Sequence, residues 1–197
     1  NEIRWNGEHG ILVLGPEEVV IQRNIMLENG NKRYSVPVFR MMPVQPGHHI
    51  FVSCKGGAKN RVVISDNSLK HPFTDAIGIV SLMDEPDGVT AHAYVANNTI
   101  EQCGRFGMII SGSFGPSRNR IHVDVHRNTF RENTQSGVMV MAACPLLEQR
   151  VENAQVSVML SDNEMRQNAT GVTAYFHLQN PPQPPTPDLF AGIADVN

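Results

Sequence analysis

A repeated asparagine–glycine pattern constrains the fold of this chain more than any other feature. In "VANNTIEQCGRFGMIISG", "VHRNTFRENTQSGVMVMA" and "LSDNEMRQNATGVTAYF", an alternating strand leads to Asn, a residue, an apolar residue, a polar turn, Gly and a second apolar run. The paired positions in these copies are Asn98 with Gly107, Asn128 with Gly137, and Asn163 with Gly171. Looser copies occur at Asn67 with Gly78, at Asn24, and at Asn1 with Gly10. A repeat of about 30 residues without an amphipathic helical period predicts a solenoid of short strands.

The fixed Asn and Gly positions have physical reasons in such a solenoid. Each coil of chain would offer three short strands whose inward apolar side chains stack on those of the next coil, about 4.8 Å away. An Asn at a corner tolerates left-handed backbone angles, and its amide can hydrogen-bond the same amide one coil along. A Gly would open the next strand where the chain turns sharply. We therefore predict one row of corner residues along the molecule: Asn24, Asn67, Asn98, Asn128 and Asn163.

The chain resembles the right-handed parallel β-helix proteins of the pectate-lyase-like superfamily. The "N-x-apolar … G-apolar-x-apolar" repeats carry this resemblance over roughly residues 1–176. It implies an all-β solenoid of about five to six coils. We assign residues 1–178 to the β-helix, with a side insertion at about 28–47, and residues 179–197 to a Pro-rich tail that packs on the solenoid.

No capping element precedes Asn1, although solenoid ends usually carry one. We therefore expect that the chain is a fragment of a longer protein, or that another segment or subunit covers the first coil.

Composition narrows the class of protein. The net charge of -3 and the scattered Lys and Arg residues argue against nucleic-acid binding, which needs a basic stripe. No apolar run approaches the roughly 20 residues that span a bilayer, so no membrane span is predicted. The three cysteines, Cys54, Cys103 and Cys144, are too few for a disulfide framework, and we interpret them as buried or half-buried thiols. The first residues, "NEIRWNGEHG", lack the apolar segment of a signal peptide, as the start of a mature exported protein also would. The compartment therefore stays unknown, with an extracellular or cell-surface location favoured.

Alignment of the strands that precede each corner Asn separates core from surface. The alternate apolar positions, such as Val123 and Val125, are predicted to form the core. The outward positions form three rows. Six residues before the Asn lie Glu18, Arg61, His92, His122 and Ser157. Four residues before it lie Val20, Val63, Tyr94, Asp124 and Met159, and two residues before it lie Gln22, Ser65, Ala96, His126 and Ser161.

These rows place an ionisable patch on one outer face, formed by Arg61, His92, Tyr94, His122, Asp124 and His126. Side chains of these types can abstract and donate protons near neutral pH. In polysaccharide lyases and uronate epimerases of this fold, an Arg or Lys neutralises the substrate carboxylate, and a His, Tyr, Lys or Arg removes the proton α to it. The resemblance implies His122 or Tyr94 as base or acid, Arg61 as the carboxylate ligand, and Asp124 as the residue that orients a His. The alternative is an ordinary solvated strand face.

A metal site is a third interpretation of the same face. Residues i and i+2 of a strand lie about 6.7 Å apart and adjacent strands about 4.8 Å apart, so His92, His122 and Asp124 could converge on one Zn²⁺. His126 lies about 13 Å along the strand from His122, too far to join them. The acidic turn "DEPDG" could hold Ca²⁺, although a solvated turn explains it as well. No cofactor is required by the predicted chemistry, and Ca²⁺ and Zn²⁺ are the candidate metals.

The strands after each Gly are expected to be apolar on both sides. Their outward rows are predicted to be Leu12, Phe51, Val80, Ile109, Met139 and Thr173, then Leu14, Ser53, Leu82, Ser111, Met141 and Tyr175. Familiar lyases of the superfamily carry an acidic calcium cleft on this sheet, and inverting hydrolases carry paired Asp residues there. This chain has neither pattern at these positions. Because strands apolar on both sides are buried on both sides, we expect the insertion, the tail or another subunit to cover this sheet.

Two classes of function stay open from the sequence. The first is carbohydrate binding or processing, with lyase- or epimerase-type proton abstraction on an acidic polysaccharide. The second is a non-catalytic structural or adhesive β-helix segment that assembles through its apolar sheet, as a homo-oligomer or on another β-helical segment. The ionisable patch favours an enzyme, and the scarcity of outward aromatic side chains favours the second class. A groove between the loops at 111–120 and 143–155 would favour the enzyme.

Overall fold

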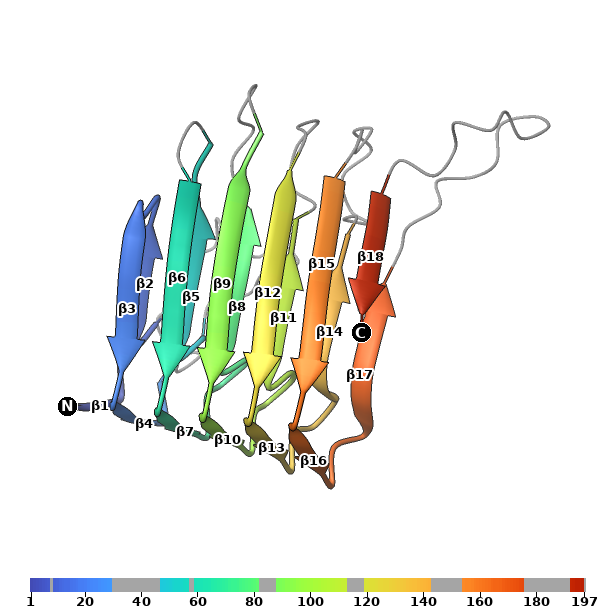
Figure 1. Cartoon of the computed structure of the whole chain (residues 1–197). Coiled ribbons are helices and arrows are strands. Elements are labelled where there is room, and N and C mark those ends of the chain that lie inside the picture. Colours follow the sequence, from blue (N-terminus) through green and yellow to red (C-terminus); the bar gives the residue numbers. More distant parts are fainter. Residues whose placement is uncertain are drawn as a thin grey trace.

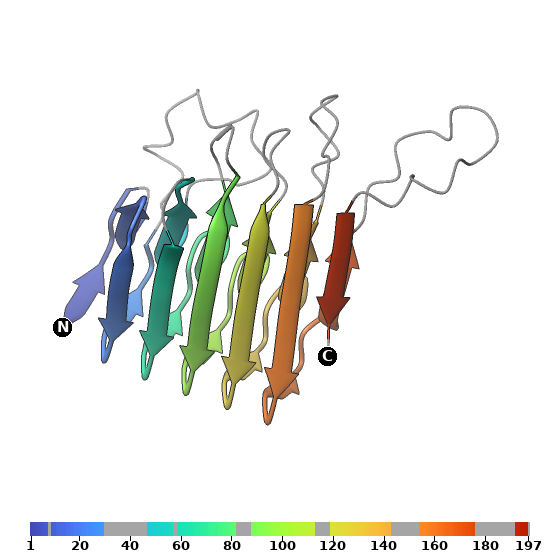
Figure 2. The ribbon, with the colours of Figure 1, turned by 45° about the horizontal axis from the view of Figure 1, so that its top comes forward.

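The computed structural model of this protein is a solenoid of three parallel six-stranded sheets (Figure 1). It describes residues 1–7, 9–29, 47–56, 59–81, 88–112, 119–142, 154–175 and 192–196. Each coil gives one strand to each sheet, so strands three apart in chain order pair in parallel. The coils follow one another along the axis, with the two chain ends at opposite ends of the solenoid (Figure 2). The predicted all-β parallel solenoid is confirmed.

The three sheets differ in strand length. The first sheet consists of three-residue strands: β1 (Glu2–Arg4), β4 (Ile25–Leu27), β7 (Ser68–Lys70), β10 (Thr99–Glu101), β13 (Thr129–Arg131) and β16 (Glu164–Arg166). The second consists of β2 (Ile11–Leu14), β5 (Ile50–Cys54), β8 (Ile77–Ser81), β11 (Met108–Ser111), β14 (Ser136–Met141) and β17 (Thr170–Tyr175). The third consists of β3 (Glu18–Gln22), β6 (Lys59–Ser65), β9 (Thr90–Ala96), β12 (Arg120–His126), β15 (Ala154–Ser161) and β18 (Gly192–Val196).

Inward side chains stack in continuous rows along the solenoid axis. One row of the first sheet contains Met26, Leu69, Ile100 and Phe130, all fully buried. Burying a side chain of this size contributes about 1.5–3 kcal/mol. Because each coil covers the apolar side chains of its neighbours, the core is one column, and no single coil could bury its own residues alone.

The predicted row of corner asparagines is confirmed. Asn67 Nδ2 donates to Asn98 Oδ1 at 2.9 Å, and Asn98 Nδ2 donates to Asn128 Oδ1 at 2.9 Å. The same Oδ1 atom of Asn128 accepts the backbone N–H of Asn98 at 2.9 Å, and Asn98 Nδ2 also donates to the carbonyl of Ile64. The row continues to Asn1 and Asn24 at one end and to Asn163 at the other. These bonds satisfy amides in the interior, where an unsatisfied group would cost about 1–3 kcal/mol.

The residue with left-handed backbone angles at this corner is not the Asn that the sequence predicted. It is the residue before each Asn, and its φ lies between 53° and 57° at Arg23, Asp66, Asn97, Arg127 and Asp162. The positive φ turns the chain one residue early, and the following Asn side chain then points inward to its neighbours in the row.

A second row of asparagines lies five residues after the first and was missed by the sequence analysis. Asn6 Nδ2 donates to Asn29 Oδ1 at 3.0 Å in the first coils, and Asn133 Nδ2 donates to Asn168 Oδ1 at 2.8 Å in the last ones. The residue before each of these positions again has a positive φ, as at Glu28. Two corners of the solenoid are therefore formed in the same way, by a residue with positive φ followed by an Asn that binds the Asn of the next coil.

The middle coils interrupt this second row because they carry Pro72 and Cys103 at the equivalent positions. Neither side chain offers an amide oxygen. The part of the row formed by Asn6 and Asn29 ends at the imidazole of His49, whose Nδ1 lies 2.8 Å from Asn29 Nδ2. The backbone N–H of Cys103 donates to Asn133 Oδ1 at 3.1 Å.

The repeated glycines are required by close packing, whereas the sequence analysis attributed them to a sharp turn. Gly107 has no left-handed φ. A Cβ placed on it would lie 2.6 Å from the carbonyl oxygen of Gly137 and 2.7 Å from Cδ1 of Phe130. No side chain fits between these atoms without displacing backbone.

The predicted pairing of Asn67 with Gly78 was wrong by two residues. Ile77 pairs with Met108, so Ala76 occupies the position equivalent to Gly107. Gly78 then belongs to the outward row of Phe51 and Ile109, and Val80 belongs to the row of Ser53 and Ser111. The insertion before β5 and the turn before β8 break the regular spacing on which the alignment relied.

The outward apolar residues of the second sheet are buried, as expected for a covered sheet. The exposed fractions are 4% for Phe51, 0% for Val80 and 1% for Ile109, against 50% for Leu12 and 68% for Leu14 in the first coil. The insertion at 30–46, the tail at 176–191, the acidic turn at 84–87 and the loops at 113–118 and 143–153 lie outside the described residues. The last part of the tail forms β18, which extends the third sheet beside β15.

The interpretation of the cysteines as buried thiols is confirmed for Cys54 and Cys103, which are both unpaired. Burial raises the pKa of Cys54 to about 12 and that of Cys103 well above its usual value. Cys144 lies outside the described residues.

Replacing Asn98 by Ala is expected to destabilise the protein by at least about 3 kcal/mol, because Asn67 N–H, Asn67 Nδ2, Ile64 O and Asn128 Oδ1 all lose a buried partner. Urea unfolding measures the change. The matched control is Asn1→Ala at the end of the row. Its side-chain bond to Asn24 is only part-buried, and its loss is expected to cost under about 1.5 kcal/mol. Equal losses in the two variants would contradict a role for burial in the row.

Candidate functional site

The register of the third sheet confirms the predicted outward rows. His122 is the partner of His92 on β9 and of Ser157 on β15. Asp124 is the partner of Tyr94. The residues between them face the core, and Val123 and Val125 are fully buried. Strand alternation therefore holds the ionisable side chains on the outer face while the core fixes the backbone beneath them.

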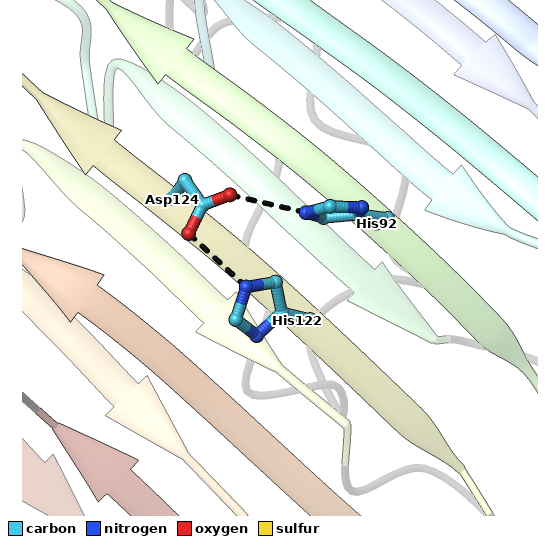
Figure 3. Close-up of side chains that lie close together, drawn as sticks. All are labelled: His92, His122 and Asp124. Atoms are coloured by element: carbon cyan, nitrogen blue, oxygen red, sulfur yellow. Dashed lines mark hydrogen bonds and ion pairs between the residues drawn. The ribbon is translucent and has the colours of Figure 1, made fainter.

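The centre of the site is the carboxylate of Asp124, which lies between two imidazoles (Figure 3). Its Oδ2 is 3.1 Å from Nε2 of His92, and its Oδ1 is 3.0 Å from Nε2 of His122. The two rings meet edge to face with centroids 4.8 Å apart. One carboxylate thus binds imidazoles from two consecutive coils, as the stacked rows predict.

The geometry fixes the proton positions on both rings when the imidazoles are neutral. A carboxylate accepts hydrogen bonds, so each Nε2 carries the hydrogen, and each Nδ1 keeps the lone pair. His122 Nδ1 lies 3.3 Å from the hydroxyl oxygen of Ser157. The His92 side chain is 63% exposed and that of His122 39% exposed, so His92 is the more accessible of the two.

The other predicted site residues lie on the same sheet but outside this cluster. Arg61 is paired with Glu18, Nη1 to Oε1 at 3.9 Å, and its side chain is 72% exposed. Tyr94 is 43% exposed beside Asp124. His126 contacts Ser161 Oγ at 2.7 Å and Asp162 at 3.5 Å. The structure therefore brings together His92, His122 and Asp124, and leaves the remaining three at its margins.

The three clustered side chains also satisfy the geometric condition for a metal site. One ligand atom from each of His92, His122 and Asp124 lies within 4.8 Å of the others. Within the described part of the chain, these three form the one group of this kind.

A second ionisable cluster, which sequence reasoning missed, lies at the corner between the first and second sheets. The Asp75 carboxylate is fully buried and is contacted by Arg105 Nη2 at 2.6 Å, by Arg105 Nε at 3.0 Å and by the backbone N–H of Phe106 at 3.0 Å. His48 Nε2 lies 3.1 Å from it, also fully buried. Burial alone would raise the pKa of Asp75, but the contacts with His48 and Arg105 outweigh it and lower the pKa to about 2. No sequence signal links these residues, because they come from three different coils.

The neighbouring His48 and His49 have separate structural surroundings. His48 packs against the rings of His9 and Phe51 on the outer side of the second sheet. His49 Nε2 lies 2.7 Å from the carbonyl oxygen of Lys70, which can only accept, so this nitrogen carries the hydrogen. Its Nδ1 therefore accepts from Asn29 Nδ2, and a proton at Nδ1 would face another donor.

Comparison with known proteins places this fold in a family. A family model described as "Right handed beta helix region" matches residues 1–175. The chain belongs to this family of right-handed β-helix proteins. No curated protein matches it.

Among solved structures, this β-helix protein is similar to a double mutant of the periplasmic alginate epimerase AlgG. The two share 14% identity with a TM-score of 0.24, over 83% of this chain and 60% of that one. The β-helix chain therefore spans about 60% of the length of that protein. None of its described segments forms a helix of the length and apolarity that crossing a membrane requires.

The stability of this β-helix protein is expected to fall as the pH is lowered from about 6.5 to about 4. Burial holds the pKa of His9 and of His49 down at about 4, against 6.5 for a free imidazole. The unfolded chain then binds more protons than the folded one in this window, so stability is full above about 6.5 and is lost on acidification. His49 alone accounts for up to about 3 kcal/mol, at 1.36 kcal/mol per pKa unit.

Urea unfolding across this pH range measures the effect, and His49→Gln is expected to reduce the slope. His92→Gln, at an exposed imidazole on the third sheet, serves as the control and is expected to keep the parent slope. A flat stability profile in the parent protein would contradict the neutral, buried state of His49.

Proposed function

We propose that this β-helix protein binds an acidic polysaccharide on the outer face of β9 and β12 and moves a proton on it, in a lyase- or epimerase-type reaction. The observation that carries the proposal is the solvent-facing Asp124 carboxylate shared by two imidazoles. A carboxylate that fixes one imidazole nitrogen as N–H leaves the other nitrogen as a base and stabilises the imidazolium that forms. The family resemblance supports uronate-containing glycans as the substrate class.

Each side chain of the patch other than His126 has a role in this proposal. His92, the more exposed imidazole, and His122, the one oriented on both nitrogens, are the proton acceptors and donors, with Tyr94 beside them as the second acid or base. Arg61 is bound to an exposed Glu18 at 3.9 Å, a contact that a substrate carboxylate would replace. Exposed ion pairs of this kind contribute little, so the exchange costs little.

The lyase and epimerase forms of the reaction share proton abstraction and differ in the step that follows it. In the lyase form, the base takes the proton from the carbon next to the uronate carboxylate, the glycosidic C–O bond at the adjacent carbon breaks, and the leaving oxygen gains a proton. The product is an unsaturated uronide. In the epimerase form, a proton returns to the opposite face of the same carbon and no bond to oxygen breaks.

Solvent-deuterium incorporation tests both forms in one experiment. The protein is incubated in D₂O with alginate, pectate or a glycosaminoglycan, and NMR follows deuterium at the carbon next to the carboxylate, while ultraviolet absorbance follows unsaturated product. His92→Ala and His122→Ala are each expected to lower the rate by about 10²–10⁴-fold, the usual contribution of general acid–base catalysis.

The control for these variants is His71→Asn, an exposed imidazole at a corner of the solenoid away from the third sheet. It is expected to retain the parent rate. Absence of both deuterium incorporation and unsaturated product with all three polymers would reject proton abstraction on these substrates.

A second candidate function, a non-catalytic structural or adhesive segment, is favoured by the apolar surface of the first coil. Large apolar side chains of this coil are exposed at Trp5, Leu12, Leu14 and Val20, whereas outward residues of the middle coils in the second sheet, Phe51, Val80 and Ile109, are buried. Exposed apolar patches mark protein contacts. The surface would accept another β-helical coil or a second copy of this chain.

Sedimentation velocity at increasing protein concentration tests this alternative. Self-association is expected to weaken in a Leu12→Ser, Leu14→Ser double variant, because these two leucines are the most exposed outward residues of β2. Association that is unchanged in the double variant would reject this surface as the contact.

A further inference from the structure

We infer that His92, His122 and Asp124 form a binding site for one divalent transition-metal ion, with Zn²⁺ the best match. The inference rests on the geometry of these three side chains. It goes beyond the proposed function and holds whether or not the protein acts on a polysaccharide.

The ligand atoms are already close to the positions that a metal requires. In a tetrahedral site with bonds of about 2.0–2.2 Å, ligand atoms lie about 3.3 Å apart. The Asp124 oxygens lie 3.1 and 3.0 Å from Nε2 of His92 and of His122. All three ligand atoms fall within 4.8 Å of one another. The remaining adjustment is at most about 1.5 Å for any pair of ligand atoms, within reach of side-chain rotation at an exposed surface.

The chemistry of the ligand set selects the kind of ion. Two imidazole nitrogens and one carboxylate suit Zn²⁺ and related transition metals, whereas Ca²⁺ takes six to eight oxygen ligands. Three protein ligands leave a fourth position open for water or for a carboxylate oxygen of a ligand. The negative charge of Asp124 offsets part of the ion's charge.

The surroundings hold these ligands in place. They stand on β9 and β12, whose inward residues Ala93 and Val123 are fully buried, so the backbone positions are fixed by the core. The hydroxyl of Ser157 lies 3.3 Å from His122 Nδ1. It accepts a hydrogen bond from this nitrogen when Nε2 binds a metal, the outer-shell contact that orients ligating histidines.

Occupation of the site has two consequences. The ion would join two consecutive coils, because His92 belongs to β9 and the other two ligands to β12. It would also bind at the two Nε2 atoms and the Asp124 carboxylate, whose hydrogen bonds orient the imidazoles for proton transfer. Bound Zn²⁺ is therefore expected to raise thermal stability and to suppress any proton-transfer activity of His92 and His122.

Isothermal titration of the metal-free protein with ZnCl₂ tests the inference directly, and Co²⁺ substitution reports nitrogen and oxygen ligands through its visible ligand-field bands. We expect one ion per chain. Ser157→Ala removes an outer-shell partner and should weaken Zn²⁺ binding by about 10- to 100-fold. His122→Ala and Asp124→Ala each remove a metal ligand and should weaken it by more than about 100-fold.

The matched control is His126→Ala, on the same strand and face but outside the cluster, which should bind Zn²⁺ like the parent. Stabilisation by a 100-fold excess of Zn²⁺ over its Kd should reach about 2.7 kcal/mol in the parent and in this control. Unfolding of the metal-free variants shows that each remains folded.

The inference is overturned if the parent does not bind Zn²⁺, or if binding persists unchanged in both His122→Ala and Asp124→Ala. The deuterium-exchange assay is run separately on the metal-free protein, so a failure of the proposed function does not affect the metal result. Metal binding with neither deuterium exchange nor unsaturated product would support this inference while rejecting the proposed function.

Discussion

The row of hydrogen-bonded asparagine amides at the first corner is the interaction on which the rest of this structure depends. Each side-chain amide donates to the Asn of the next coil and to a backbone carbonyl of the preceding coil, as Asn98 does with Asn128 and Ile64. The row therefore fixes which residue of one coil lies beside which residue of the next. A slip of one residue would turn every inward side chain outward. Register, core and surface rows all follow from this one constraint.

The candidate site is a product of that register. Strand alternation places His122 and Asp124 on the same face, and strand pairing places His92 beside His122. Because neighbouring strands lie only about 4.8 Å apart, side chains from distant parts of the chain share one carboxylate. The solenoid thus concentrates functional groups on an outer sheet without forming a pocket from the core.

The same three groups support two kinds of chemistry that exclude one another at a given moment. Proton transfer needs a free imidazole lone pair and an N–H fixed by Asp124. Metal binding uses the Nε2 atoms and the carboxylate together. In these two proposals, the metal and the polysaccharide available to the protein decide whether the three side chains bind an ion or transfer a proton. The buried group of His48, Asp75 and Arg105 differs, because the contacts with Arg105 and His48 outweigh burial and hold the Asp75 carboxylate ionised.

The sequence by itself determined the solenoid, the first asparagine row and the outward rows of the third sheet, because these features repeat at a fixed spacing that a single chain displays. It also predicted that His92, His122 and Asp124 could converge, since strand spacing is a constant of β-structure. It failed where the repeat is irregular: Gly78 was taken for the position that Ala76 occupies, and the second asparagine row was hidden by Pro72 and Cys103.

Only the tertiary structure decided which members of the ionisable patch bind one another. Arg61 and His126 share the face with Asp124, but Glu18 and Ser161 hold them elsewhere. It also revealed Asp75 with Arg105 and His48, and His49 within the second asparagine row. The physical reason is that side-chain direction and burial depend on contacts between coils. Spacing along a strand specifies a residue's face, and only packing of the coils determines its partner.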